Sequence, residues 1–536
     1  MKRVSVAQMK ALESQADAGG LSYDQMMANA GLALAQVVHW RYFRRPTRSV
    51  LGLVGSGNNG GDCLIALRHL AEWGWQTQAY LLKARAGEDA PLTDYRKAGG
   101  QVLGVDDDHD LEKLKQHALQ ADLIMDGVLG TGVKLPLKGE IQRALAALNV
   151  LRDLPPVVAV DCPSGVDCDN GKAAKECLRA ELTVCMAAVK AGLLEQPALG
   201  LAGEICTVEI GLGDDLPAWA GADVEVMDAC TAAENLPERP ADSHKGTYGT
   251  CLIAAGSVNY CGAALLAARA AYRMGTGLVR VGVPGAIYDT LAGQLAEATW
   301  LILPHTNGVI NSEGAKVVWK NLDRVNALLI GPGWGLENET KEFLEDLLNL
   351  QKGKGNASSL GFVPEEHELI NASMKLPALV IDADGLKLLA QIENWQEKIQ
   401  TAVLTPHPGE MAVMSGLSIA EIQADREAIA REYAQRWGHV LVLKGAMTVV
   451  ASPEGEVAII PTATSALATA GTGDVLAGMI TGLIAQGLEP YTAAKTAAWL
   501  HARAGIKAAR QLGSEASVMA GDVIAQLPQV LNEISS

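Results

Sequence analysis

Short runs of Val, Ile, Leu and Ala alternate along the chain with segments whose apolar residues recur at helical spacing. The runs show little polar alternation, which predicts strands buried on both faces, as in parallel sheets that helices cover. In the first half the predicted strands span 49–54, 76–82, 123–126, 157–161, 182–186 and 205–210. In the second half they span 249–254, 278–283, 327–330, 378–381, 402–404, 440–443 and 448–451. The pattern predicts the α/β fold class, with two three-layer α/β domains.

A stretch with several prolines and few strong apolar runs, 214–245, separates the two sets of strands. Such a stretch is typical of a linker between domains. A chain of 536 residues is also too long for one ordinary core. We therefore expect two domains, 1–220 and 221–536, with a polar surface insertion at 351–373.

The net charge is negative, because 44 Lys and Arg residues stand against 61 Asp and Glu residues. This balance argues against a nucleic-acid or acidic-membrane partner, and any phosphate must be held by local groups. The N-terminus lacks the apolar stretch of a signal peptide. Glycines interrupt the uncharged stretch 246–268, which predicts a strand, a turn and a helix rather than a membrane span. We expect a cytoplasmic protein.

Two features suggest metal binding at first sight. The nine cysteines include no Cys-x-x-Cys pair, which favours reduced thiols over a zinc site. The acidic run 106–110 lies between a predicted strand and a predicted helix. Such a run is more often a solvated turn with a helix cap than a metal site, and we expect the cap.

A glycine-rich segment, Val54-Gly-Ser-Gly-Asn-Asn-Gly-Gly-Asp62, follows a predicted strand and precedes a helix predicted over 63–73. It has the Gly-x-Gly-x-x-Gly spacing that lets a backbone approach a dinucleotide at a helix N-terminus. The usual fingerprint adds an acid at the end of the next strand to bind a ribose. That strand ends at Leu82-Lys83 without one, so an ordinary NAD-dependent dehydrogenase is disfavoured.

Two more predicted strands of this half end in aspartates. Asp126 leads into a segment with three glycines, and Asp161 leads into Cys-Pro-Ser-Gly. Carboxyl ends of strands line the binding crevice of a doubly wound sheet, so both acids can face one ligand. Either aspartate alone could be a helix cap. Together with the glycine-rich segment they favour a binding site.

These three segments resemble the NAD(P)H-hydrate epimerases, over about residues 1–215 including Met27-Ala-Asn-Ala-Gly31. The resemblance implies a Rossmann-like N-terminal domain in which Asp161 contacts the hydrated ring and handles the proton. It implies K⁺ bound by Asn59, Asp126 and Ser164, a set of oxygen ligands that suits a hard cation. It assigns the hydrated dinucleotide to Asn58, Asn59, Gly60, Gly61, Asp62, Gly130, Thr131, Gly132, Val133, Lys134, Leu135, Pro136 and Asp161. One departure is Cys63, where the family commonly has Gly.

In the second half, Gly471-Thr-Gly-Asp474 precedes a helix predicted over 475–487. A Gly-x-Gly turn at a helix start can hold a phosphate, and an acid beside it can act on a hydroxyl. The segment Lys444-Gly-Ala-Met-Thr448 follows a predicted strand and can turn around a nucleotide. His407, between two prolines, could be structural, but Glu410 after it favours a site.

These segments, with His244-Lys-Gly246, 256–263, 331–333 and 382–384, resemble the ADP-dependent NAD(P)H-hydrate dehydratases. The resemblance covers about 225–536 and implies a ribokinase-like fold. It assigns the hydrate to Ala263, Gly333, His407 and Asp474, with Asp474 catalytic. It assigns the adenine nucleotide to Lys444, Gly445, Ala446, Met447, Thr448 and Gly473. The departures are Thr247, where an acid is usual, and Ala470, where Gly is frequent.

The combined expectation is a bifunctional isomerase and lyase that repairs NADHX and NADPHX, the hydrates of NADH and NADPH. ADP, with Mg²⁺, would be the co-substrate, and the assembly would be a homo-oligomer. A vitamin-precursor kinase, which would need ATP, is the main alternative for the second half. A nucleotide-sensing or scaffold module without activity is an alternative for the whole chain.

Overall fold

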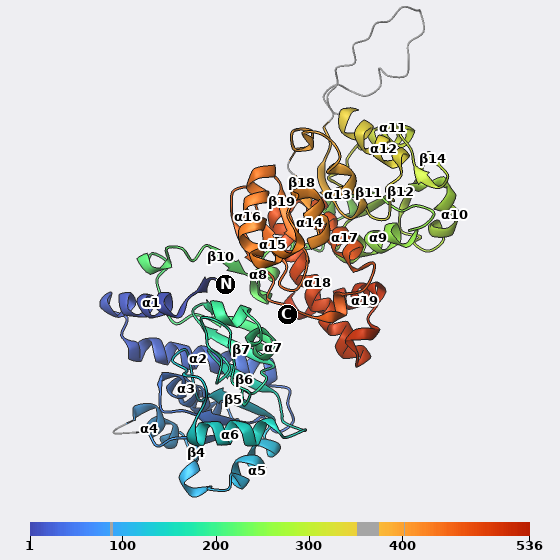
Figure 1. Ribbon diagram of the computed structural model, residues 1–536. Helices are drawn as coiled ribbons and strands as arrows, with labels where there is room; N and C mark the ends of the chain where they lie inside the picture. Colours follow the sequence, from blue (N-terminus) through green and yellow to red (C-terminus); the bar gives the residue numbers. More distant parts are fainter. Residues whose placement is uncertain (86–88, 351–374, 401, 536) are drawn as a thin grey trace, which may run out of the picture. The chain divides into compact units, whose positions relative to one another are not determined.

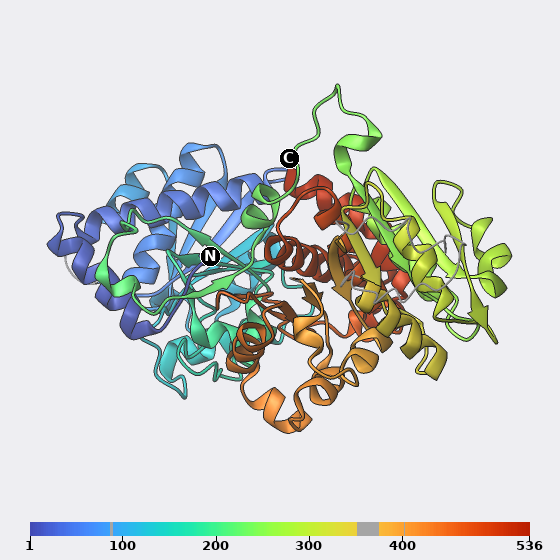
Figure 2. The same cartoon turned by 90° about the horizontal axis from the view of Figure 1, so that it is seen from above.

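The computed structural model describes residues 1–85, 89–350, 375–400 and 402–535. The chain forms two compact units, Met1–Asp228 and Ala229–Ser536. In Figures 1 and 2 each unit shows a central sheet with helices on both faces, which confirms the predicted fold class. The surface insertion expected at 351–373 lies outside the described residues.

The first unit is built on a seven-stranded sheet in which every strand pair is parallel. Its strands, in spatial order, are β4 (Gln101–Gly104), β3 (Gln76–Leu81), β2 (Ser49–Val54), β5 (Leu123–Gly127), β6 (Val157–Val160), β7 (Leu182–Met186) and β9 (Glu204–Val208). A separate pair joins β1 (Arg3–Val4) to β8 (Val189–Lys190). The helices are α1 (Val6–Ala18), α2 (Tyr23–Tyr42), α3 (Asn58–Glu72), α4 (Ala90–Lys97), α5 (Glu112–Gln120), α6 (Gly139–Asn149) and α7 (Ala198–Ala202), and β10 (Val224–Val226) lies near the end of the unit.

Two apolar cores flank this sheet because successive side chains of each strand point to opposite faces. Val50 and Val54 of β2 belong to the core that includes residues of α1–α4. Leu51 and Leu53 belong to the core that includes residues of α5 and α6. Burial on both faces explains why β2 is apolar throughout, as a central parallel strand must be.

The sheet of the second unit runs in the order β21 (Val457–Ile459), β20 (Val449–Ala451), β19 (Val440–Leu443), β18 (Ala402–Leu404), β17 (Ala378–Ile381), β16 (Ala327–Ile330), β11 (Thr250–Ala254), β12 (Leu278–Pro284) and β13 (Thr299–Leu303). The pairs from β19 to β13 are parallel, and β19, β20 and β21 pair antiparallel. A small hairpin joins β14 (His305–Thr306) and β15 (Val309–Ile310). The helices are α8 (Ala229–Glu234), α9 (Gly262–Arg273), α10 (Gly285–Ala292), α11 (Glu313–Lys320), α12 (Asn338–Asn349), α13 (Asp384–Leu389), α14 (Pro408–Ser415), α15 (Ile419–Ala424), α16 (Arg426–Trp437), α17 (Thr472–Ala485), α18 (Pro490–Leu512) and α19 (Ala520–Ser535).

A candidate site lies at the N-terminus of helix α17. From Val475 to Ala485 every residue of α17 is buried, and the helix packs against α9, α18 and the sheet. A Cβ on Gly478 would lie 2.2 Å from the carbonyl oxygen of Ala267 in α9. The close approach of the two backbones therefore requires glycine at this position.

The differences from the predicted elements have local causes. Strands β4 and β13 were not predicted, because they are edge strands with partly exposed side chains. Helix α3 begins at Asn58 and not at 63, so residues 58–62 form its first turn. Helix α17 likewise begins at Thr472 and not at 475. Both first turns are rich in glycine and polar residues, which conceal a helix start in the sequence pattern.

Two further expectations can be compared with the structure. Asp108 of the acidic run accepts hydrogen bonds from the amides of Lys113 (3.1 Å) and Leu114 (2.8 Å), so it caps α5 as predicted. It is buried rather than solvated, and the Tyr80 hydroxyl also donates to it at 3.0 Å. Within the described ranges, none of the helices has the length and apolar character that crossing a membrane requires. The stretch 246–268 folds as β11, a turn and the start of α9, as predicted.

Candidate active sites

The carboxyl ends of β5 and β6 and the start of α3 meet at one edge of the first sheet (Figure 1). Asn59 of α3 donates to the carbonyl oxygens of Leu129 (3.0 Å) and Val160 (2.8 Å). A Cβ on Gly55, in the turn before α3, would lie 1.9 Å from the carbonyl oxygen of Val128. The glycine therefore lets the turn approach the segment that follows β5, which brings α3 against the ends of both strands.

Asp126, Ser164 and Asn59 form a buried cluster of oxygen atoms at this edge. The Ser164 hydroxyl donates to Asp126 Oδ1 at 2.5 Å, and the Ser164 amide donates to Oδ2 at 2.8 Å. Burial raises the pKa of Asp126, while the hydrogen bonds from Ser164 oppose that rise. Among the described residues, no lysine or arginine contacts this carboxyl. Oxygen ligands of this kind suit a hard cation.

Asp161 lies directly after β6 in the left-handed backbone region, with φ of 65°. Lys190 of β8, only 1% exposed, forms an ion pair with Asp161 and also donates to the carbonyl oxygen of Met186 at 3.0 Å. The amide of Met186 donates to the same carboxyl at 2.9 Å. Burial lowers the pKa of Lys190, but the charge and hydrogen bond of Asp161, together with the nearby thiols of Cys185 and Cys162, raise it above its ordinary value. Backbone strain of this kind is typical of functional positions.

Two more carboxyl groups share the electrostatic environment of this ion pair. Burial, followed by the negative charge of Asp161, raises the pKa of Asp62 well above its usual range. Burial also raises the pKa of Glu13 in α1, although Lys190 lowers it. The sequence reasoning found Asp62 but missed Glu13 and Lys190. A lysine that follows the apolar strand 182–186 so closely was the available signal for Lys190.

The remaining residues that the sequence assigns to the first site lie around the same edge. Gly130 approaches Asn59, since a Cβ there would lie 3.4 Å from the amide carbon of Asn59. Residues 131–136 lead from it and are mostly exposed. Arg85, which the sequence reasoning missed, donates to the carbonyl oxygens of Gly55 (2.5 Å) and Gly57 (3.2 Å) and pairs with Asp89. This arginine therefore fixes the turn that precedes α3.

In the second unit, Lys444 stands among acids contributed by several elements. Its ammonium group donates to Asp382 Oδ1 at 2.6 Å and lies 3.9 Å from Glu410 Oε2. A Cβ on Gly473 would lie 3.4 Å from the same nitrogen, so the start of α17 is adjacent. The Thr405 hydroxyl holds Asp382 at 2.8 Å. Lys444, which the sequence assigns to the nucleotide, is thus also next to Asp474.

The pKa of Asp474 departs strongly from its ordinary value. Burial, and then the negative charge of Asp382, raises its pKa from 3.8 to about 7, although Lys444 opposes the shift. A carboxyl with a pKa near neutrality can accept a proton at physiological pH and release it again. The first turn of α17 also presents backbone N–H groups that have no partner within the helix. This combination suits a proton acceptor beside a bound phosphate.

His407 serves as the N-cap of α14, which is the structural role that the sequence left open. Its Nδ1 accepts from the amides of Gly409 (2.9 Å) and Glu410 (3.3 Å), and Nε2 lies 3.3 Å from Glu410 Oε1. The ring is nevertheless 53% exposed. The cap therefore fixes the orientation of an accessible imidazole, and the structural and the binding role are compatible.

Two other groups of predicted residues lie in the second unit: Gly333 with Ala263, and residues 445–448. Gly333, with φ of 64°, packs against α9, because a Cβ there would lie 2.8 Å from the Cβ of Ala263. Residues 445–448 form the turn between β19 and β20, which the Thr448 hydroxyl closes with a 3.0 Å bond to the Gly445 carbonyl.

His501 of α18 is a residue that the sequence did not predict. It is buried and hydrogen-bonds to the backbone of Thr472, and burial lowers its pKa to about 4. It supports the start of α17 as a neutral ring.

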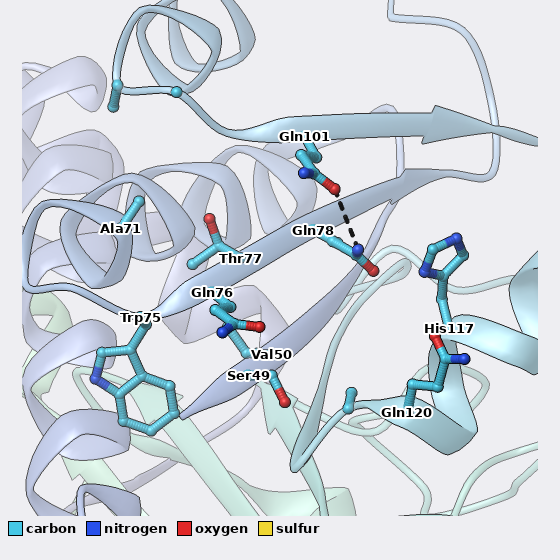
Figure 3. Close-up of a pocket in the computed structure, with 13 residues that line it drawn as sticks. Ser49, Val50, Ala71, Trp75, Gln76, Thr77, Gln78, Gln101, His117 and Gln120 are labelled. Carbon is cyan, nitrogen blue, oxygen red and sulfur yellow. Dashed lines mark hydrogen bonds between the residues drawn. The ribbon is translucent and has the colours of Figure 1, made fainter. Parts of the chain in front are cut away.

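A polar cavity of about 400 Å³ lies at the other edge of the first sheet (Figure 3). The residues labelled around it include Trp75, Gln76, Gln101 and His117, from the amino ends of β3 and β4 and from the end of α5. None of the predicted site residues lines it. Substrate binding in doubly wound sheets occurs at the carboxyl ends of the strands, which is where the carboxyl groups described above gather.

Comparison with known proteins finds a matching family model in each unit. The family described as NAD(P)H-hydrate dehydratase matches residues 251–529, and the family described as YjeF-related protein N-terminus matches residues 23–192. The bifunctional NAD(P)H-hydrate repair enzyme of Moorella thermoacetica is 37% identical over 521 residues, which cover 95% of this chain and 92% of that relative. The enzyme of the same description from Salinibacter ruber is 34% identical and covers 96% of this chain and 93% of its own length.

Among solved structures, an ADP/ATP-dependent NAD(P)H-hydrate dehydratase from Bacillus subtilis is 30% identical. It covers 58% of this chain and 99% of its own, with a TM-score of 0.47. The curated relatives, in contrast, match both units in one continuous alignment. On that identity and coverage, the chain is an enzyme that belongs to the family of bifunctional NAD(P)H-hydrate repair enzymes.

Proposed function

We propose that the chain repairs NADHX and NADPHX in two steps. The N-terminal domain, 1–220, interconverts the R and S hydrates, and the C-terminal domain, 221–536, dehydrates the S hydrate at the expense of ADP. The observation that carries the proposal is Asp474, a carboxyl with a pKa of about 7 at the start of α17 beside Lys444. The arrangement combines a proton acceptor with a phosphate-binding helix start.

The hydroxyl of the hydrate is a poor leaving group until it is phosphorylated. Asp474 accepts the hydroxyl proton while the oxygen attacks the terminal phosphorus of ADP, and AMP leaves. The phosphate then leaves the ring carbon, and a proton from the neighbouring carbon departs to restore the double bond. Lys444 and the N–H groups of α17 stabilise the negative charge on the transferring phosphoryl group.

In the first domain Asp161 handles the proton at the hydroxyl-bearing carbon, and the ion pair with Lys190 orients its carboxyl. Residues 58–62 and 130–136 would bind the hydrated dinucleotide. Potassium would be held by Asn59, Asp126 and Ser164, whose buried oxygens and lone acid fit such an ion. Bound there, it would supply positive charge for the phosphates of the dinucleotide in a protein whose own net charge is negative.

For the second domain the proposal includes Mg²⁺, which the phosphates of ADP would bring, with the Asp382 carboxyl as a nearby oxygen donor. Ala263, Gly333 and His407 would contact the hydrate, and residues 444–448 with Gly473 would contact the nucleotide. The sequence-based expectations of a cytoplasmic location and a homo-oligomeric assembly complete the proposal.

The decisive experiment supplies mixed-epimer NADHX and ADP to the full-length protein. We expect recovery of the absorbance band of reduced nicotinamide from both epimers, with AMP and phosphate formed in equal amounts. A requirement for ATP and a stable phosphorylated product would instead establish the vitamin-precursor kinase. Absence of turnover with either nucleotide would favour the sensing or scaffold module.

The pKa of Asp474 leads to a pH prediction for dehydration. A proton acceptor must be ionised to act, so the rate should fall as the pH drops through about 7 and the carboxyl becomes protonated. The measurement is the initial rate with the S epimer and saturating ADP across the pH range. The residual rate of Asp474→Asn should lack this step, and a wild-type rate that stays constant below pH 7 would contradict the assignment.

A further inference from the structure

We propose that Arg426 is a positioning residue of the dehydratase site, which orients the backbone of the turn that would hold the ADP phosphates. This inference rests on the proposed function and adds a residue that neither the sequence reasoning nor the resemblance assigned. Arg426 is the first residue of α16 and lies 18 positions before Lys444 in the sequence. Its guanidinium group contacts the turn between β19 and β20.

The guanidinium group of this arginine donates to the two carbonyl oxygens at which the turn begins. Its Nη2 donates to the carbonyl of Leu443 at 2.7 Å and to that of Lys444 at 3.3 Å. Its Nη1 donates to Gln423 Oε1 at 3.0 Å, which ties the side chain to α15. Asp425 caps α16 by accepting from the amide of Ala428 at 3.1 Å, so the arginine extends from a fixed helix start.

Gly445 packs directly against the same guanidinium group. Its φ is 148°, and a Cβ on it would lie 3.1 Å from Nη2 and 3.2 Å from Nη1 of Arg426. The backbone conformation and the close approach of the charged group therefore both favour glycine at this position. The turn is thus built around its contact with the arginine.

The hydrogen bonds from Arg426 also fix the direction of two peptide N–H groups. In a planar trans peptide the N–H points opposite to the C=O. The Leu443 carbonyl faces the guanidinium, and the Lys444 amide of the same peptide donates to the Pro406 carbonyl at 2.9 Å. The Lys444 carbonyl faces the guanidinium as well, so the Gly445 amide points away from it. Among the described residues this amide has no hydrogen-bond partner, and it is available to an anion.

The protein does not neutralise the positive charge of Arg426. In the described part of the chain no carboxylate contacts the guanidinium group, and its buried Nε has no hydrogen-bond partner. Burial lowers the pKa of Arg426, and no neighbouring acid opposes that effect. Because buried charges in proteins are normally paired, an arginine of this kind suits a site that receives an anion.

The turn held by Arg426 carries Lys444 into the proposed phosphate site. The Lys444 ammonium donates to Asp382 Oδ1 at 2.6 Å and is adjacent to Gly473 at the start of α17. Arg426 therefore acts through the backbone of the turn and needs no contact of its own with the nucleotide. It sets two donors for the phosphates of ADP, the Gly445 amide and the Lys444 ammonium.

The test is Arg426→Met in the full-length protein, with binding of ADP and Mg²⁺ measured by calorimetry in the absence of the hydrate. Methionine keeps much of the length of the side chain but lacks the charge and the N–H donors. We expect the dissociation constant for ADP to rise by about 10-fold to 10²-fold, as for the loss of hydrogen bonds from a charged group. The KM for the S epimer and the rate at saturating ADP should stay near their wild-type values.

Arg426→Lys should bind ADP with an affinity between those of the wild type and Arg426→Met, because lysine keeps the charge but not the fork of donors. Arg436→Met removes an exposed cation from the last turn of the same helix, and this matched control should bind ADP like the wild type.

Wild-type affinity for ADP in Arg426→Met would overturn the proposal. An equal loss of affinity for ADP and for the S epimer, with a lower melting temperature, would also overturn it, because it indicates general damage to the fold. If the wild-type protein binds ADP but does not consume the S epimer, the proposed function fails, and the ADP affinity of Arg426→Met still decides the role of the arginine. If the wild-type protein binds no ADP, both fail.

Discussion

Replacing Asp474 by asparagine is expected to lower ADP-dependent dehydration by about 10²–10⁴-fold, the range for a positioned acid–base group. Asparagine keeps the shape and the polarity of the side chain but cannot accept the hydroxyl proton. The shift of the Asp474 pKa to about 7 shows that the fold stabilises the neutral form at a cost to the charged one. The rate should be measured with the pure S epimer, saturating ADP and Mg²⁺.

Two controls for this prediction use the same chain: the epimer exchange of the variant and a change of an exposed acid. Exchange of the R and S epimers by Asp474→Asn should equal that of the wild type, because it depends on the first domain. Asp323→Asn, a change of an acid whose side chain is 84% exposed in the same unit, should leave dehydration unaffected. ADP-dependent turnover of Asp474→Asn at the wild-type rate would exclude Asp474 as the proton acceptor.

The parts of the sites that the sequence predicts lie where strands end. Asp126 and Asp161 were placed at one sheet edge from the chain pattern alone, because parallel strands bring their carboxyl ends together. The structure puts both there, and Asn59 (3.0 Å) and Ser164 (3.3 Å) both donate to the carbonyl oxygen of Leu129, just after β5. Local pattern suffices in these cases because the strand that positions the residue is itself an uninterrupted apolar run.

The partners of these residues could not be predicted, because they depend on packing between distant segments. Lys190 pairs with Asp161 across the turn that follows β7. Lys444 and Asp382 are 62 positions apart in the sequence. The sequence around a charged residue does not indicate which oppositely charged residue will contact it in the folded protein. These contacts are therefore known only from the structure.

Lys190→Met is the second change with a large expected effect, this time on stability as well as on activity. Removing one member of a buried ion pair leaves an uncompensated charge and costs about 3–5 kcal/mol. Asp161 would keep the amide of Met186 as a partner but lose the ammonium group. We expect a lower unfolding temperature of the first unit in calorimetry, loss of epimer exchange, and unchanged ADP-dependent consumption of the S epimer.

The double variant Lys190→Met/Asp161→Asn separates the two roles of the pair. Replacing both charges by neutral groups of similar size is often neutral for stability, so the double variant should recover most of the lost unfolding free energy. It should not recover epimer exchange, because the proton-accepting carboxylate is gone. If Lys190→Met unfolds like the wild type, the ion pair contributes nothing to the fold. If the double variant exchanges epimers normally, Asp161 does not handle the proton.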